Sequence, residues 1–355
     1  MDLHLIFDLM SPPGATPHRE LYPAMLDICA WAEEAGFSCV NFGEHHVSDA
    51  GYNPSPLITC AVVAGRTKRL RMRTNVLLAP LYDPLKLAED TAVLSLASGG
   101  RFDILLGGGY RPSECAMFGK RMEDRWAAVG ETVSVLRQAW TGEPFQYLDR
   151  TVRVRPVPDP APKILLGGMS AAAARRAARI ADGFAVPGQM GLWEAYRQEC
   201  IAQGKPDPGP ETPLGPVFLW IAEDVEAAWQ MLMPHVLNQI TEYARFMGES
   251  YGQDIGPYRG ATDPAAVRAN PAYRVLTPEE AIALGHALGS SGRLYVSPLL
   301  GGVPIDAAWG MLKLFDSRAR PYLPDSSQWP QTEPEELARS RDSSRASRRG
   351  ASFPS

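Results

Sequence analysis

Cysteine is scarce in this sequence, and long apolar runs are missing. The five cysteines form no CxxC pair, and four of them lie within apolar runs, which argues against a disulfide framework or a zinc site and indicates buried thiols in a reducing compartment. No apolar run approaches the ~20 residues that a membrane span needs. The opening MDLHLIFDLM has no basic segment before its short apolar run, so we expect no signal peptide and a cytoplasmic protein.

Neither sign of charge dominates, and the net charge is only −5. The sequence therefore offers no basic footprint for nucleic acid or for an acidic membrane surface, and we expect a small-molecule substrate. With 45% hydrophobic and 21% charged residues, the chain can bury a large core. Residues 323–355 are rich in Ser, Arg and Pro. We expect one domain over residues 1–322 and then a disordered tail, with a basic docking tail as the alternative.

Three common cofactor and hydrolase motifs are also missing. Gly107 and Gly109 are followed by Pro112, where the dinucleotide-binding GxGxxG pattern needs a third glycine. Neither GxxxxGK[ST] nor GxSxG is present, so a nucleotide triphosphatase and an α/β-hydrolase are unsupported. The glycines of GGGY nevertheless end a predicted strand, where they leave room for a flat ring to lie against the backbone.

Short apolar runs alternate with amphipathic stretches along the chain. Leu21, Met25, Ile28 and Ala32, for example, recur at helical spacing before the next apolar run. This alternation predicts parallel βαβ units, and eight strands favour a (β/α)8 barrel with insertions over an open doubly wound sheet. The predicted strands are residues 3–9, 39–42, 71–78, 102–107, 163–168, 183–186, 216–222 and 294–298.

Two segments interrupt the alternation. Residues 141–162 alternate around Leu148 and Asp149, which indicates a β-hairpin. Residues 248–272 are rich in Gly, Pro and Tyr without clear periodicity. We expect a long loop there, either a lid over the barrel mouth or a packed surface excursion.

The stretch NFGEHH places Glu44, His45 and His46 directly after the second predicted strand. In a barrel this position lies at the carboxyl ends of the strands, where functional groups gather. A metal site, a satisfied structural pair and a catalytic acid or base are the alternatives. Side chains of adjacent residues on an extended backbone point apart, and no HExxH partner is present, so a titratable imidazole near neutral pH is favoured over a metal site.

The stretch ILLGGMSAAAARRAARI runs from a strand into an alanine-rich helix. Gly168 and Met169 lead to Ser170, which stands where a helix N-cap belongs. A helix start offers free N–H groups and the positive end of the dipole, which together suit a phosphate. A plain strand-to-helix turn with a serine cap is the alternative.

At this point the residues resemble a known family. AEEAGFSCVNFGEHHVSDAGYNPSP, RTNVLLAPLYDPLKLAEDTAVLSLASGGRFDILLGGGYRPSE and RPVPDPAPKILLGGMSAAAARRAARIADGF, in this order, are similar to the bacterial luciferase-like flavin-dependent monooxygenases. The resemblance covers roughly residues 1–320. It implies a (β/α)8 barrel, commonly a homodimer, that holds reduced FMN at the strand ends and uses dioxygen to oxidise a small organic substrate.

The resemblance also implies roles for particular residues. His45 matches the histidine to which the family assigns acid–base work, with Glu44 and His46 beside it. Asn75 and Val76 align with a non-prolyl cis peptide beneath the flavin ring, and the turn around Ser170 aligns with the segment that receives the flavin phosphate. The implied cofactor-binding residues are Asn75, Gly108, Gly109, Tyr110, Gly168, Met169 and Ser170.

One difference from the family leaves the choice between FMN and another cofactor undecided. Luciferases carry an arginine where this sequence has Gly108, and the GGGY form resembles relatives that use the deazaflavin coenzyme F-420 for hydride transfer. An F-420-dependent oxidoreductase and a non-catalytic flavin-binding protein are therefore the alternatives. No nicotinamide fingerprint is present, so we expect a separate flavin reductase to deliver reduced FMN.

Overall fold

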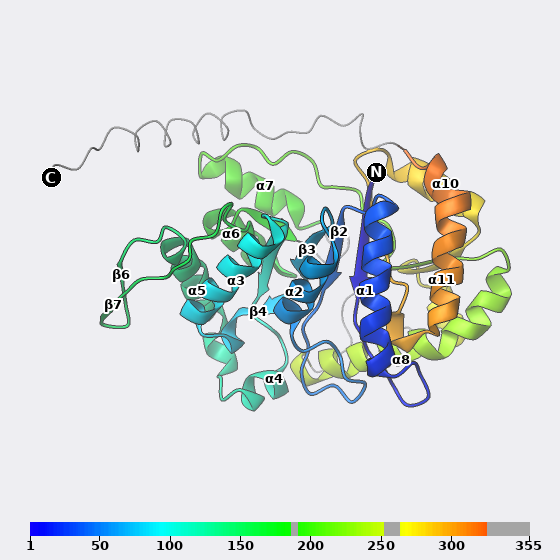
Figure 1. Ribbon diagram of the computed structural model, residues 1–355, viewed down its shortest axis with the longest axis horizontal. Coiled ribbons are helices and arrows are strands. Elements are labelled where there is room, and N and C mark those ends of the chain that lie inside the picture. Colours follow the sequence, from blue (N-terminus) through cyan, green and yellow to red (C-terminus); the bar gives the residue numbers. More distant parts are fainter. Residues whose placement is uncertain (186–190, 252–262, 325–355) are drawn as a thin grey trace.

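The computed structural model describes residues 1–185, 191–251 and 263–324, and a curled parallel sheet lies at its centre (Figure 1). Consecutive strands are neighbours in this sheet, so their carboxyl ends meet at one edge. The hydrogen-bonded order is β12 (Arg293–Val296), β1 (Asp2–Phe7), β2 (Cys39–Phe42), β3 (Arg71–Thr74), β5 (Phe102–Gly107), β8 (Ile164–Gly167) and β9 (Gly183–Ala185), and β4 (Leu77–Leu78) also pairs with β5.

A further pair of strands extends the curve of this sheet. β10 (Phe218–Ile221) pairs with β11 (Tyr273–Leu276) in parallel. The segment before β10 lies against β12, because the Gly215 N–H donates to the Arg293 carbonyl at 2.8 Å. Within the described ranges no strand pairing joins β9 to β10, so the hydrogen-bonded sheet has one open seam. The predicted (β/α)8 barrel with insertions is confirmed, with that seam as its irregularity.

The helices that connect the strands form an outer layer, in which α1, α2, α3 and α5 lie side by side (Figure 1). The apolar stripe predicted for α1 faces the core, since Leu21, Met25, Ile28 and Ala32 are fully buried. The outer helices are α1 (His18–Glu34), α2 (Pro56–Arg66), α3 (Pro84–Ser98), α5 (Arg125–Ala139), α6 (Ala171–Ile180), α7 (Trp193–Ala202), α10 (Pro278–Leu288) and α11 (Ile305–Leu314). No helix in the described ranges combines the length and the apolar character that a bilayer crossing requires.

The hairpin predicted in residues 141–162 is confirmed. β6 (Phe145–Tyr147) and β7 (Arg150–Val152) pair antiparallel, and both residues of the turn, Leu148 and Asp149, have positive φ angles of 45° and 58°. Two positive φ angles in a two-residue loop give the turn whose twist matches a hairpin. The remaining short elements are α4 (Pro112–Met117), η1 (Ala79–Leu81), η2 (Met122–Asp124), η3 (Leu300–Gly302), the π-helical η4 (Phe315–Ala319) and η5 (Arg320–Tyr322).

The long loop expected at residues 248–272 is only partly a loop. α8 (Val225–Tyr251) continues four residues into this segment, and α9 (Pro264–Ala269) occupies its end. Sequence periodicity missed the end of α8 because none of residues 248–251 is buried, so they add nothing to the apolar stripe of the helix. Residues 252–262, the middle of the expected lid, lie outside the described residues, as does the expected tail from residue 325 onward.

Two predicted strands end earlier than the apolar pattern suggests. β1 stops at Phe7 because the Asp8 side chain turns back to accept the N–H of Met10 at 3.0 Å. The run at residues 71–78 is divided into β3 and β4 at the peptide bond between Asn75 and Val76, which is cis as the family resemblance implies.

A buried polar network lies at the amino-terminal end of the barrel. Asn41 donates to His4 Nδ1 at 3.2 Å, so the other ring nitrogen, Nε2, carries the proton that His4 donates to Asp2 at 3.0 Å. Arg293 binds the same carboxylate at 2.8 Å. Burial lowers the pKa of His4 to about 4, and the positive charge of Arg293 acts in the same direction although the bond to Asp2 opposes it. His4 is therefore a neutral, fully paired imidazole in the folded protein.

We predict that His4 makes the fold sensitive to mild acid. The unfolded chain takes up this proton near pH 6.5 and the folded chain only near pH 4. The stability from His4 is therefore fully present above pH 6.5 and is lost as the pH falls towards 4, by up to about 3 kcal/mol at ~1.4 kcal/mol per pKa unit. Urea unfolding at pH 7 and pH 5 should show a smaller loss in His4→Gln than in the wild type. Equal losses in both proteins would contradict the assignment.

Candidate functional site

The expected site residues gather where the parallel strands end, close to α4 and α8 at the lower edge of Figure 1. Residues 43–46 directly follow β2, residues 108–111 follow β5, and Asn75 stands between β3 and β4. Because all these strands run in the same direction, their following loops share one end of the barrel.

His45 and His46 point in opposite directions, as predicted for adjacent residues on extended chain. His45 Nδ1 lies 2.9 Å from Glu114 Oε1, while His46 Nε2 lies 3.0 Å from Glu44 Oε1. The ring of His46 packs against Phe118, with 4.8 Å between the ring centroids. The two imidazoles therefore belong to two different carboxylates.

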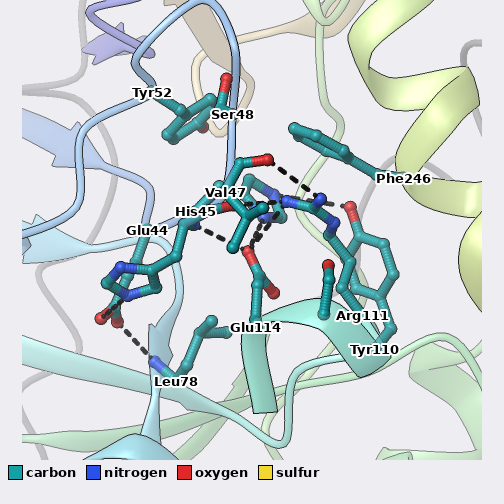
Figure 2. A network of polar contacts seen from close by, with 12 residues as sticks. Glu44, His45, Val47, Ser48, Tyr52, Leu78, Tyr110, Arg111, Glu114 and Phe246 are labelled. Atoms are coloured by element: carbon teal, nitrogen blue, oxygen red, sulfur yellow. Dashed lines mark hydrogen bonds and ion pairs between the residues drawn. The ribbon is translucent and has the colours of Figure 1, made fainter. Parts of the chain in front are cut away.

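The Glu44 carboxylate fastens the segment after β3 to this turn. Its Oε2 accepts the N–H of Leu78 at 2.7 Å (Figure 2). Its Oε1 accepts the hydroxyl of Tyr82 at 2.8 Å and also binds His46 Nε2. Glu44 is 2% exposed. The structure thus places Glu44 and His46 together as a buried brace beside His45.

Glu114 is the functional partner that sequence reasoning missed. Pro112 starts α4, and this puts Glu114 on the first helical turn, where its carboxylate accepts both His45 Nδ1–H and the His46 backbone N–H at 2.9 Å (Figure 2). Burial alone would raise the pKa of Glu114, but the bonds to His45 and His46 and the charge of Arg111 lower that pKa below its usual range. Its Oε2 is buried and has no hydrogen-bond partner among the residues that the structure describes.

Four aromatic rings enclose His45. The ring centroids of Tyr52 and Phe246 each lie 4.8 Å from that of His45, and those of Tyr110 and Tyr243 lie 5.6 and 5.7 Å away. The Tyr110 hydroxyl lies 3.5 Å from His45 Nε2. This wall keeps bulk water from the imidazole, which is 8% exposed. Tyr243 and Phe246 come from α8, about 200 residues further along the chain, so no local pattern could have indicated them.

Asp8 ties α8 to the barrel on the other side of the same mouth. Gln239 of α8 donates to Asp8 Oδ2 at 2.9 Å, and the N–H of Gly301 lies 3.3 Å from both carboxylate oxygens. Burial raises the pKa of Asp8 to about 6, although these donors act against that rise. Sequence reasoning placed Asp8 inside a strand and therefore missed it.

The glycines after β5 and β8 mostly make room for protein side chains. A Cβ on Gly107 would lie 2.8 Å from Val76, and one on Gly108 would lie 2.7 Å from the ring of Trp126. A side chain at Gly107 or Gly108 would therefore collide with the protein itself, whereas a flat ring against their backbone stays a prediction. Gly109, with a φ of +70°, would meet only Leu78, at 3.7 Å, and it keeps its backbone open beside the half-buried Tyr110.

Ser170 caps α6 as predicted. Its Oγ accepts the N–H of Ala173 at 3.2 Å, and the side chain is exposed. A Cβ on Gly168 would lie 2.3 Å from the Cβ of Ala173, so only glycine lets β8 approach the helix this closely. Gly168 and Met169 are half-buried. A helix start also offers N–H groups that an anion can accept.

Two arginines that meet over Trp126 were also missed. The guanidinium groups of Arg125 and Arg176 lie over the ring of Trp126, at 5.1 and 4.3 Å from its centroid, and Trp126 covers Gly108. Neither arginine forms an ion pair within residues 1–185, 191–251 and 263–324, and the buried Nε of Arg125 has no partner there. Burial and the nearby charge of Arg125 lower the pKa of Arg176. Two cations that share the face of one ring, one of them on the second turn of α6, fit a phosphate group.

The described residues contain no group of three or more His, Cys, Asp or Glu side chains that could hold a metal ion. The histidines of NFGEHH bind carboxylates instead, one each.

Comparison with known proteins identifies the fold and the family. The sequence pattern of the family described as luciferase-like monooxygenase matches residues 5–283. The chain is similar to the oxygenase component of a flavin-dependent trigonelline monooxygenase of Acinetobacter baylyi, with 30% identity over 155 residues that make up 41% of this chain and 43% of that protein. It is also similar to an F420-dependent glucose-6-phosphate dehydrogenase of Amycolatopsis mediterranei, with 29% identity over 191 residues, 50% of this chain and 56% of that protein.

The matches thus span about half the length of these curated relatives. Among solved structures, the oxygenating constituent of 3,6-diketocamphane monooxygenase of Pseudomonas putida, in complex with FMN, superposes with a TM-score of 0.70 and 22% identity, over 91% of this chain and 99% of that one. That likeness shows a shared fold. Because the family pattern extends over most of the chain and includes the turn that carries His45, the chain belongs to the luciferase-like monooxygenase family.

Proposed function

We propose that the protein is a flavin-dependent monooxygenase that oxidises a small organic substrate beside His45. The observation that carries this proposal is the buried His45–Glu114 pair at the barrel mouth, 2.9 Å apart and walled by aromatic rings. Bound reduced FMN would supply two electrons to dioxygen, so that one oxygen atom enters the substrate and the other leaves as water. The trigonelline and diketocamphane monooxygenases named above support this reaction class.

The chain's own residues would move a proton and exclude water. The ionised Glu114 carboxylate holds the His45 proton on Nδ1, which leaves Nε2 as the nitrogen that can accept a proton or, once protonated, donate it. Nε2 faces the Tyr110 hydroxyl at 3.5 Å, so Tyr110 can orient it. Oε2 of Glu114, which has no partner among the described residues, is a second acceptor for a substrate hydroxyl or a water molecule. In this proposal Glu44 and His46 brace the turn, and their catalytic part is smaller.

The described residues also fit the cofactor. Ser170, the α6 start and the two arginines on Trp126 would hold the phosphate, while Gly109, Tyr110 and Asn75 would lie towards the ring. The arginines replace the charge that the sequence lacks at Gly108, so that departure no longer weighs against FMN. Dioxygen and a separate reductase are the proposed partners.

An F-420-dependent dehydrogenase is the second candidate, favoured by the GGGY turn and by the similarity to the Amycolatopsis enzyme. In that case His45 would exchange a proton with the substrate hydroxyl while hydride moves between carbon atoms. A non-catalytic flavin-binding protein is the third candidate, and turnover of any substrate would exclude it.

We predict that His45→Ala lowers turnover ~100-fold or more in a protein that still folds and binds FMN, because the proton acceptor is removed. Glu114→Gln should also lower turnover, because it removes the carboxylate charge that holds the His45 proton on Nδ1. His46→Ala is the matched comparison and should cost less, since its imidazole contacts Glu44 on the opposite side. Equal losses at both histidines would argue against the assignment of His45.

We predict that Arg176→Ala and Ser170→Asp each weaken the binding of reduced FMN at least tenfold, which corresponds to about 1.4 kcal/mol. The first variant removes a cation and the second places like charge against the phosphate. Arg175→Ala is the control, because Arg175 is exposed on the same helix and removes the same charge. Anaerobic titration measures all three affinities, and repeating it with reduced F-420 compares the two cofactors. Tighter binding of F-420 by the wild type would favour the dehydrogenase.

The proposed assembly is a homodimer through α2 and α3. Ile58 and Val62 on α2 and Val93 and Leu96 on α3 are all exposed, from 41% to 67%, on two adjacent helices (Figure 1). Four clustered aliphatic side chains favour a second apolar surface as their partner.

We predict that Val93→Asp converts the dimer into a monomer, because it buries an unpaired charge in the contact. Ile201→Asp is the control, since Ile201 is 45% exposed on α7, away from this patch. Light scattering after gel filtration gives the mass of each. A monomeric wild type, or a dimeric Val93→Asp variant, would contradict this interface.

A further inference from the structure

Arg111 is the largest fully buried side chain of the described protein. It contacts the turn that carries Glu44, His45 and His46, which we call the EHH turn. Its Nη1 contacts the His46 carbonyl at 2.5 Å and Glu114 Oε1 at 3.4 Å, and its Nη2 donates to the Val47 carbonyl at 3.3 Å (Figure 2). The same guanidinium therefore contacts both the backbone that carries His45 and the carboxylate that binds it.

The other side of Arg111 contacts the end of α8. Nη2 donates to Glu249 Oε1 at 2.9 Å, Nε lies 3.3 Å from Oε2, and the guanidinium stacks on Phe246 at 3.7 Å from the ring centroid. Ser113 donates to the same Glu249 carboxylate at 2.6 Å. One buried cation thus joins α8 to the turn and to α4.

We infer that Arg111 is a positioning residue that makes the alignment of the His45–Glu114 pair depend on the docking of the C-terminal end of α8. The inference rests on the proposed role of His45. It names Glu249 as the carboxylate on α8 through which the docking acts.

The burial of Arg111, Glu114 and Glu249 explains how a movement of α8 would act on the His45–Glu114 pair. The Arg111 side chain is 0% exposed and that of Glu114 is 2% exposed, whereas Glu249 is 25% exposed. A buried cation that loses one of its carboxylates is left partly uncompensated, which is strongly unfavourable. When Glu249 leaves, Arg111 must shift towards Glu114 or towards water. Either shift disturbs the carboxylate oxygen that holds the His45 proton.

A second contact fastens the same helix to the same turn. Ser48 donates to Glu242 at 3.0 Å, and Arg245 donates to the Val47 carbonyl at 3.2 Å. These contacts are more exposed than Arg111 and do not reach Glu114. Arg245 also binds Glu249, at 3.3 Å, and so gives it a second link to the turn. Of these groups only Arg111 contacts Glu114, and we therefore assign the transmission to the pair to Arg111.

Hydrogen exchange in the cofactor-free protein tests the coupling without reference to activity. Glu249→Gln should speed exchange at least tenfold both at the end of α8, residues 239–251, and in the turn at residues 41–48, which Glu249 does not itself contact. Glu226→Gln is the matched control. It removes a carboxylate–arginine pair, Glu226 with Arg268, from the other end of α8 and should change neither segment. Faster exchange confined to α8 in Glu249→Gln would overturn the inference.

Kinetics then separate positioning from simple stability. Glu249→Gln should lower kcat about tenfold with little change in KM, because the pair is misaligned while the substrate contacts remain. Glu249→Asp should restore part of kcat, and Ser113→Ala should give a smaller loss of the same kind. An unchanged kcat in Glu249→Gln would contradict the inference. A wild type without turnover on any cofactor would remove the proposed function, and the exchange comparison would still decide the coupling.

Discussion

The buried carboxylate of Glu114 needs more hydrogen-bond donors than any one element provides. Its Oε1 is contacted by His45, by the backbone N–H of His46 and by Arg111, which come from the loop after β2 and the start of α4. A carboxylate left in an apolar wall without such donors would be protonated or expelled. The packing of α4 against the EHH turn is therefore an electrostatic requirement as much as a steric one.

The need of buried charges for partners also explains why α8 crosses the mouth of the barrel. Its side chains meet one buried charge at each edge of the mouth, Asp8 through Gln239 and Arg111 through Glu249. Between these two points it presents Tyr243 and Phe246 to His45. The helix thus satisfies charges that the barrel cannot satisfy alone, and in the same step it supplies the apolar wall.

Sequence patterns predicted the parts of this protein that depend on neighbours along the chain. The stripe on α1, the hairpin turn at Leu148 and the cap at Ser170 each follow from residues a few positions apart. The opposite directions of His45 and His46 follow from backbone geometry alone.

What the sequence could not predict depends on contacts between distant segments. Glu114 lies in a stretch whose glycines draw attention, and only its approach to His45, 69 positions away, reveals its role. Arg125 and Arg176 likewise look like ordinary charges on two helices until Trp126 brings them together. The early end of β1 depends on a side-chain bond from Asp8, which no apolar pattern contains.

Arg111 differs from Arg125 and Arg176 in how its charge is compensated. Arg111 is neutralised inside the protein by Glu114 and Glu249, whereas Arg125 and Arg176 have no internal counterion in the described residues. Dissolved salt screens charges that face solvent far more than charges cancelled within a buried network. If the protein works as proposed, ionic strength would therefore act selectively on it: salt would weaken the capture of a phosphate-bearing ligand at α6 and leave proton transfer at His45 nearly unchanged.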